Sequence, residues 1–154
     1  MNVVNKPITG QEDKTDAASP YAALTDFYQA FNNQDTDLMQ ANWLQSEEAS
    51  MSNPLGGLKR GWNEISKVYK NIFNGPANVY VEFYDYSIHT AENMFIAVGR
   101  ERGSLEINSK AIDLAIRTTR AYCLHDNQWK QIHHHGSMDN PHLLATYQTT
   151  LLNK

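Results

Sequence analysis

The first half of the chain carries apolar residues at the 3.6-residue spacing of amphipathic helices. Ser19-Pro20 is a typical helix start, with a capping side chain followed by a proline in the first turn. The apolar face that follows consists of Tyr21, Leu24, Phe27, Tyr28 and Phe31. Asp35 predicts the cap of a short second helix, and a third helix is predicted over residues 61–73, before Gly75-Pro76.

From residue 79 onward the period changes to two, which predicts strands. We expect strands over residues 79–88, 94–103, 111–124 and 128–137, and a shorter strand over 49–53. The connections between the four long strands are too short to hold crossover helices, so we expect an antiparallel sheet. Helices followed by strands form an α+β pattern.

The two ends of the chain lie outside these patterns. Residues 1–18 are polar and follow neither period, so we expect a mobile N-terminal tail before a domain that spans residues 19–139. Asn140-Pro141 repeats the cap-plus-proline start, and Leu144, Tyr147 and Leu151 follow at helical spacing. Residues 140–154 are therefore expected to form a C-terminal helix, with a frayed tail as the alternative.

Strand alternation places two arginines on apolar faces. In residues 111–124 the bulky apolar side chains occupy even positions, and Arg120 is among them. In residues 94–103 the even positions include Ile96, Val98 and Arg100, so we expect Arg100 to face inward as well. A buried guanidinium keeps its proton and needs an anionic partner, water or a ligand.

Three sources can satisfy such an arginine. One is an ion pair with an internal carboxylate such as Glu82, Glu101 or Asp113, and another is solvent reached from a strand end. Two inward arginines on separate strands favour the third, a cavity that receives an anion. Guanidinium geometry suits a carboxylate in particular.

Three consecutive histidines lie within the last predicted strand. Alternation puts His133 and His135 on the face of Trp129 and Gln131, and His134 on the opposite face. A pair of histidines two residues apart can bind zinc, but no third ligand has a fixed relation to this pair, so we predict no metal. The alternatives are hydrogen-bonded histidines at a sheet surface or subunit contact, and a role for His134 as an acid or base in a pocket.

Composition narrows the function classes. The chain has 154 residues, the size of one domain, with a formal net charge of −4 and no basic stripe, which disfavours nucleic acid as a partner. Its single cysteine, Cys123, excludes a disulfide framework. We expect no membrane partner and a cytoplasmic location, because no apolar run suits a membrane span or a signal peptide. No motif predicts a cofactor.

The order of elements and the segment Trp129–Ser137 resemble the SnoaL-like branch of the NTF2-like superfamily, and above all the association (hub) domain of calcium/calmodulin-dependent protein kinase II. Of the family pattern W-x-x-V-H-F-H-R-S, this chain has Trp129, Ile132, His133, His135 and Ser137. Gly136 stands in the place of the arginine. Two further strands match hub patterns, as Ile96-Ala97-Val98-Gly99-Arg100 and Thr119-Arg120-Ala121-Tyr122.

This resemblance implies an NTF2-like cone, in which a curved sheet wraps around the N-terminal helices. It also implies a homodimer formed through the outer face of the sheet, and a pocket in which arginines at the places of Arg100 and Arg120 bind small carboxylates. It directs His134 towards that pocket. Gly136 removes one arginine of the family's site, and Arg102 is a candidate to replace it. The helix histidine of the hub is replaced by Ile65.

We therefore hypothesise a domain that binds a small anion with Arg100 and Arg120 and also mediates oligomerisation. Tyr28, Trp43 and Tyr69 would form the apolar wall of its pocket, with His134 beside the ligand. One alternative is a SnoaL-like enzyme of the isomerase, dehydratase or cyclase type that uses His134 as its acid or base. The other is a purely structural association module.

Overall fold

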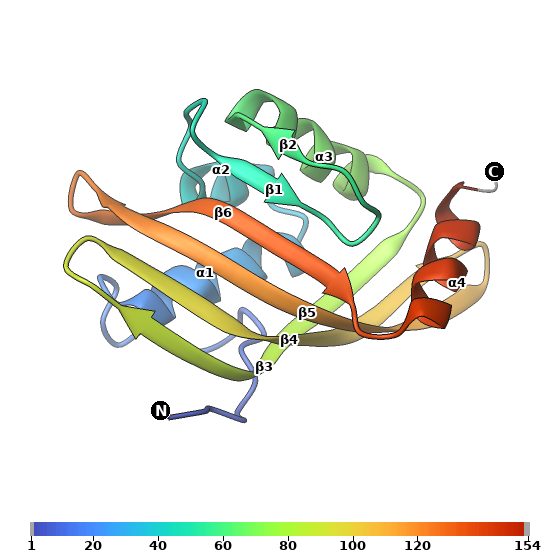
Figure 1. The fold of residues 1–154 in the computed structure, drawn as a ribbon, viewed down its shortest axis with the longest axis horizontal. Helices are drawn as coiled ribbons and strands as arrows, with labels where there is room; N and C mark the ends of the chain where they lie inside the picture. The colour runs from blue at the N-terminus through green and yellow to red at the C-terminus, as the bar shows by residue number, and fades with distance from the viewer. Residues whose placement is uncertain (1, 153–154) are drawn as a thin grey trace.

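The computed structural model describes residues 2–152, which form four helices and six strands (Figure 1). The helices are α1 (Pro20–Asn32), α2 (Thr36–Asn42), α3 (Trp62–Asn74) and α4 (Pro141–Leu152). The strands are β1 (Ser50–Ser52), β2 (Lys59–Arg60), β3 (Asn78–Thr90), β4 (Met94–Ile107), β5 (Lys110–His125) and β6 (Gln128–Met138). The α+β class predicted from the sequence is confirmed.

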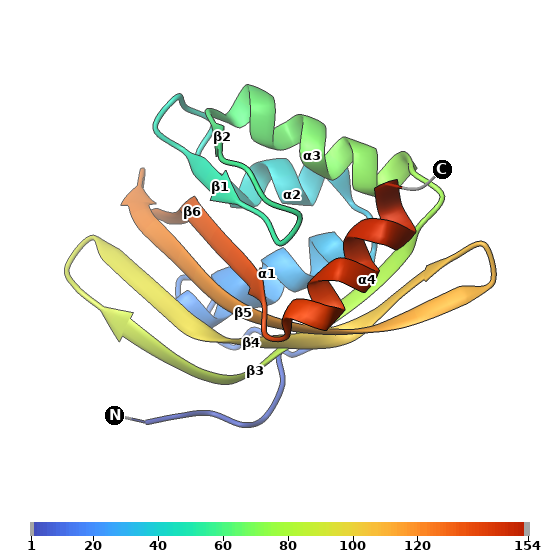
Figure 2. The same ribbon diagram turned by 45° about the vertical axis from the view of Figure 1, so that its right-hand side comes forward.

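The six strands form one curved sheet that is not closed, in the order β2-β1-β6-β5-β4-β3. Helices α1, α2 and α3 lie on its concave side (Figure 2). The prediction of a wholly antiparallel sheet is wrong at one pair, because β1 runs parallel to β6, with Ser50 opposite His133. Short connections join only the four consecutive strands from β3 to β6. Along the chain, β1 is separated from β6 by β2, α3 and strands β3 to β5, and this long connection permits a parallel pair.

Side-chain caps begin the first two helices. The Ser19 side chain accepts a hydrogen bond from the Ala22 amide at 3.1 Å, and that of Asp35 accepts one from the Leu38 amide at 2.9 Å. Both caps satisfy amides that the first turn of a helix leaves without partners. The buried face of α1 then packs into the sheet, with Leu24, Phe27 and Tyr28 all in the core.

The inner face of β4 differs from the prediction. Its buried residues are at odd positions and include Phe95, Ala97 and Glu101, while Ile96 and Arg100 are exposed. The prediction failed because the inner face carries small and polar residues where other elements fill the space. A Cβ at Gly99 would lie 2.6 Å from the Cβ of Tyr86 on β3, so the aromatic side chains of β3 need this gap.

A β-bulge in β6 changes which residues share a face. Tyr122 pairs with Gln131 and Ala121 pairs with His133, so Ile132 is the extra residue. A bulge shifts the alternation by one position. Gln131 and His134 therefore both face inward, although strict alternation assigns them to opposite faces.

The N-terminal segment pairs with the edge of the sheet, so the prediction of a mobile tail needs correction. Val4 and Ile8 form antiparallel bridges with Tyr86 and Phe83 of β3, and Ile8 is 0% exposed. Gly10 then passes close to α1 at φ +94°, where a Cβ would lie 2.2 Å from the Gln29 amide nitrogen. Two buried contacts thus hold a segment that has no regular hydrophobic period.

The C-terminal segment is helical, as its cap-plus-proline start predicts. Helix α4 crosses the open end of the curved sheet (Figure 2). Leu143, Leu144, Tyr147 and Leu151 pack against the core from this side. No helix within residues 2–152 is long and apolar enough to cross a membrane.

Candidate functional site

A cavity of about 310 Å³ lies between the concave face of the sheet and the helices. Its wall is largely apolar and is supplied by α1, α3, α4, the loop after β1, and strands β1 and β3 to β6. Representative lining residues are Phe31, Val68, Ile72, Leu114, Tyr147 and Leu151. Polar side chains line the same space, and those buried at the sheet end of the cavity are Tyr69, Glu101, Arg120 and His134.

Arg120 is only 2% exposed and is held by four neighbours. Its Nη2 donates to Glu101 Oε1 at 2.8 Å, its Nη1 donates to Gln131 Oε1 at 2.8 Å, and its Nε donates to the Tyr28 hydroxyl at 3.2 Å. The guanidinium also lies over the ring of Phe27, with Cζ 3.5 Å from the ring centroid. Cation–π contact and paired hydrogen bonds together stabilise a buried charge.

Glu101 compensates the charge of Arg120. The carboxylate is buried, and its Oε1 also accepts a hydrogen bond from the Tyr28 hydroxyl at 2.6 Å. Burial raises the pKa of Tyr28 well above its ordinary value, so the hydroxyl keeps its proton and acts as a donor. This ion pair is the first of the three sources that the sequence left open for Arg120.

His134 is 8% exposed and lines the cavity, and neither of its ring nitrogens has a hydrogen-bond partner among the described residues. Burial, followed by the nearby charge of Arg120, lowers the pKa of His134 well below 6.5, so the imidazole is neutral at pH 7. Gly136 leaves room for this ring, since a Cβ there would lie 3.2 Å from His134 Nε2. A neutral imidazole offers one donor and one acceptor to a ligand.

Of the three aromatic residues predicted to form the pocket wall, only Tyr69 lines the cavity. Its hydroxyl is buried without a hydrogen-bond partner among the described residues, and burial raises its pKa. Tyr28 and Trp43 lie behind the wall, 0% and 1% exposed, in the hydrophobic core. Tyr28 still affects the site through Glu101 and Arg120.

Arg100 and Arg102 lie on the outer face of the sheet, so the prediction of an inward Arg100 is wrong. The side chain of Arg100 is 50% exposed and pairs with Asp85 at 3.2 Å and Asp139 at 3.3 Å. Arg102 pairs with Glu82 at 2.6 Å. Arg102 therefore does not replace the arginine that is missing at Gly136.

Sequence reasoning named Glu101 only as one of three carboxylates that could pair with a buried arginine, and it missed the role of Gln131 in the site. Glu101 shares the inner face with Arg120 because odd positions of β4 pair with even positions of β5, as Ala97 does with Arg120. Gln131 faces inward only because of the β6 bulge. The register between β4 and β5 would have predicted that Glu101 faces inward. No sequence pattern predicts the bulge in β6.

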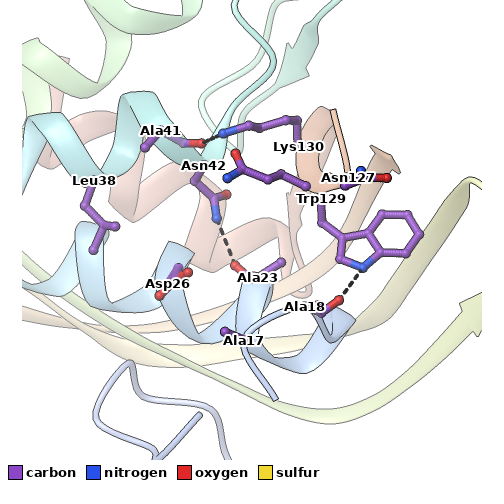
Figure 3. Close-up of a pocket in the computed structure, with 11 residues that line it drawn as sticks. Ala17, Ala18, Ala23, Asp26, Leu38, Ala41, Asn42, Asn127, Trp129 and Lys130 are labelled. Carbon is purple, nitrogen blue, oxygen red and sulfur yellow. Dashed lines mark hydrogen bonds between the residues drawn. The ribbon is translucent and has the colours of Figure 1, made fainter. Parts of the chain in front are cut away.

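A second hollow, about 420 Å³ in volume, opens on the surface between α1, α2 and the β5–β6 turn (Figure 3). Its rim is held by the Trp129 indole, which donates to the Ala18 carbonyl at 3.0 Å, and by Lys130, which donates to the Ala41 carbonyl. Asn42 lies in its wall and donates to the Ala23 carbonyl at 2.9 Å. Asn42, Trp129 and Lys130 thus direct their donors to backbone carbonyls of the protein itself, which makes this hollow a weaker ligand site than the inner cavity.

The two outer histidines have different surroundings. His133 shares a hydrogen bond of 2.7 Å with Ser50 of β1, and His135 is exposed. Within residues 2–152 no three His, Cys, Asp or Glu side chains gather closely enough to hold a metal ion.

The model of the SnoaL-like domain matches residues 21–141, most of the chain. The chain belongs to the SnoaL-like family. The match leaves out the N-terminal segment on β3 and nearly all of α4, so the SnoaL-like domain here carries additions at both ends. No curated protein matches this chain.

Solved structures resemble this SnoaL-like domain in fold. One, provisionally assigned as a calcium/calmodulin-dependent protein kinase type II association domain from Thiobacillus denitrificans, has a TM-score of 0.64 and 22% identity and covers 79% of this chain and 96% of its own. A provisionally assigned dehydratase of the NTF2-like family from Streptomyces avermitilis has a TM-score of 0.68, 18% identity and coverage of 77% and 92%. An uncharacterised protein with a cystatin-like fold from Caulobacter vibrioides has a TM-score of 0.64, 19% identity and coverage of 85% and 94%. These likenesses confirm the NTF2-like fold.

Proposed function

We propose that this chain is a small-molecule-binding domain whose ligand occupies the inner cavity. The observation that carries the proposal is His134, which is buried at the cavity wall and whose ring nitrogens have no hydrogen-bond partner within residues 2–152. A buried polar group without a partner costs about 1–3 kcal/mol. A ligand that supplies the missing hydrogen bonds recovers that cost.

The dimensions and lining of the cavity support the same proposal. Its volume of about 310 Å³ falls at the lower end of the range for ligand sites. Such sites combine an apolar wall with a few convergent polar groups. Here the polar groups include His134, Tyr69 and the Arg120–Glu101 ion pair.

The anion expected from the sequence finds less support. Arg100 is outside the cavity, and Arg120 already has Glu101 as its counter-ion. An ion pair of this kind attracts a further anion much less than a free guanidinium does. The charge of the ligand therefore depends on Glu101 as much as on Arg120.

Replacing His134 with leucine tests the site, and His135→Leu is the matched control on the outer face. We expect His134→Leu to weaken the binding of a cavity ligand at least about tenfold, a loss equivalent to one good hydrogen bond. His135→Leu should bind as the wild type does. Calorimetry with a panel of small aromatic alcohols, ketones and acids gives the affinities, and equal binding by both variants would refute the assignment of the cavity.

Catalysis is the second candidate, and it has one specific observation in its favour. A neutral His134 with free ring nitrogens can accept a proton, and Tyr69 faces the same cavity. No carboxylate lies within hydrogen-bond distance of His134 among the described residues, so nothing orients the imidazole as in a catalytic pair. The same two variants test this candidate, because deuterium uptake by a bound ketone would disappear only in His134→Leu.

We also propose that the outer face of the sheet forms a dimer contact. Met94, Ile96 and Val98 of β4 are 38%, 39% and 43% exposed and lie side by side on that face. Apolar side chains grouped on a surface are typical of protein interfaces. A purely structural role would require only the outer face of the sheet and would give the inner cavity no function.

A further inference from the structure

The two oxygens of the Glu101 carboxylate have different surroundings. Oε1 accepts from both the Tyr28 hydroxyl at 2.6 Å and Arg120 Nη2 at 2.8 Å. Among the described residues, no side chain or amide donates to Oε2, although the carboxylate lines the cavity. A carboxylate oxygen held in place with no protein donor is a strong acceptor for a ligand.

The electrostatic balance of this end of the cavity is neutral. Arg120 and Glu101 carry opposite charges 2.8 Å apart, and His134 is uncharged at pH 7. A bound carboxylate would bring a second negative charge next to Glu101, in a largely apolar space with little screening. Like charges placed together at a binding site cost several kcal/mol.

We propose that the cavity selects a neutral ligand that bears a hydroxyl group, and that this hydroxyl donates a hydrogen bond to Oε2 of Glu101. This inference rests on the proposed binding function and specifies the ligand class. The apolar body of the ligand lies against the α3 and α4 walls, and His134 and Tyr69 supply further hydrogen bonds. Glu101 thus converts what would be a carboxylate site into a site for an alcohol or phenol.

Three probes of nearly equal size test the proposal at pH 7: 2-naphthalenemethanol, 2-naphthoate and 2-methylnaphthalene. On the wild type we expect the alcohol to bind at least about tenfold more tightly than the carboxylate, because one like-charge contact costs that much or more. The hydrocarbon should bind more weakly than the alcohol. Isothermal titration calorimetry measures all three.

Glu101→Gln removes the negative charge while keeping the shape of the side chain. The variant leaves the charge of Arg120 uncompensated, so we expect 2-naphthoate to become the tightest of the three probes, with a gain of about tenfold or more. Glu106→Gln, on an exposed residue of the same strand, should keep the wild-type order. Circular dichroism checks that each variant is folded.

The outcomes separate this inference from the proposed function. If the wild type binds the carboxylate as tightly as the alcohol, the inference is wrong and the binding function stands. If the wild type binds none of the three probes, the binding function fails and the inference fails with it. Should Glu101→Gln not fold, the order of affinities on the wild type decides alone.

Discussion

Two buried polar groups of the inner face avoid the cost of burial in different ways. Arg120 cannot lose its proton, so it keeps its charge and pairs with Glu101 at 2.8 Å. His134 has no acidic partner and becomes neutral instead, because burial lowers its pKa. The neutrality of His134 makes the stability of the domain depend on pH.

The low pKa of His134 makes the folded state sensitive to acid. The unfolded chain binds a proton at this residue below about pH 6.5 and the folded chain does not, so stability falls as the pH drops below that value. Each unit of pH can remove up to about 1.4 kcal/mol from the free energy of unfolding. Urea unfolding at pH 7.5 and pH 5.5 measures the loss, which should be smaller in His134→Leu.

His135→Leu is the control for this experiment, because that ring is exposed. It should lose slightly less stability than the wild type on acidification, because His135 is one of the smaller causes that lower the pKa of His133 and His134. If His134→Leu also matches the wild type, His134 is not the group that titrates. The pKa of His133 is lowered as well, by burial and then by His135, and adds a contribution of the same sign in all three proteins.

Some of these residues are predictable from the sequence and others are not. Arg120 follows from β5, where the inner face is also the bulky one, from Leu114 to Tyr122. Arg100 does not, because the aliphatic residues in the first half of β4, Met94, Ile96 and Val98, are on its outer face. Alternation alone identifies two faces, and only the register with β5 decides which one is buried.

At the level of elements, the edge strand β3 is covered by a segment that has no period of its own. Ile8 and Phe83 exchange two backbone hydrogen bonds, of 2.8 Å and 2.9 Å, and Val4 and Tyr86 exchange another pair. These bonds satisfy groups that an open sheet edge would leave exposed to other chains. Alternation of apolar and polar residues predicts regular strands well. Two isolated bridges four residues apart involve too few residues to produce a detectable alternation.

Ile8→Ala tests whether the N-terminal segment stabilises the domain. Ile8 is fully buried beside β3, so its truncation should lower the free energy of unfolding by about 2–5 kcal/mol. Val3→Ala, at a residue that is about half exposed, should change it by less than about 0.5 kcal/mol. Chemical denaturation measures both variants. An unchanged midpoint for Ile8→Ala would show that the segment contributes nothing to stability.

At the level of the whole molecule, the fold follows from the sequence more readily than the site does. The order of helices and strands sets the α+β class, and the W-x-x-I-H-x-H pattern near the end of the chain points to the family. The site depends on the β6 bulge, on the register of β4 and on α4, which supplies Tyr147 and Leu151 to the cavity. These features arise from tertiary packing.

At the scale of the whole molecule, the proposed dimer can be tested by changing the outer face of the sheet. We expect Val98→Glu to weaken the proposed dimer at least about tenfold, because it places a charge within an apolar contact. Leu58→Glu is the matched control, since Leu58 is an equally exposed apolar residue outside the sheet. Sedimentation equilibrium measures the monomer fraction of each. A wild type that is monomeric at all concentrations would rule out the dimer.

The parallel pair of β1 and β6 has a consequence for the order of folding. Ser50 and His133, which meet in this pair, are 83 residues apart in the chain, whereas β3, β4, β5 and β6 join through short hairpins. Closing a loop of that length has an entropic cost that no local contact offsets. We therefore expect the hairpins to form first, and the docking of β1, which brings α3 over the cavity, to complete the proposed ligand site only at the end of folding.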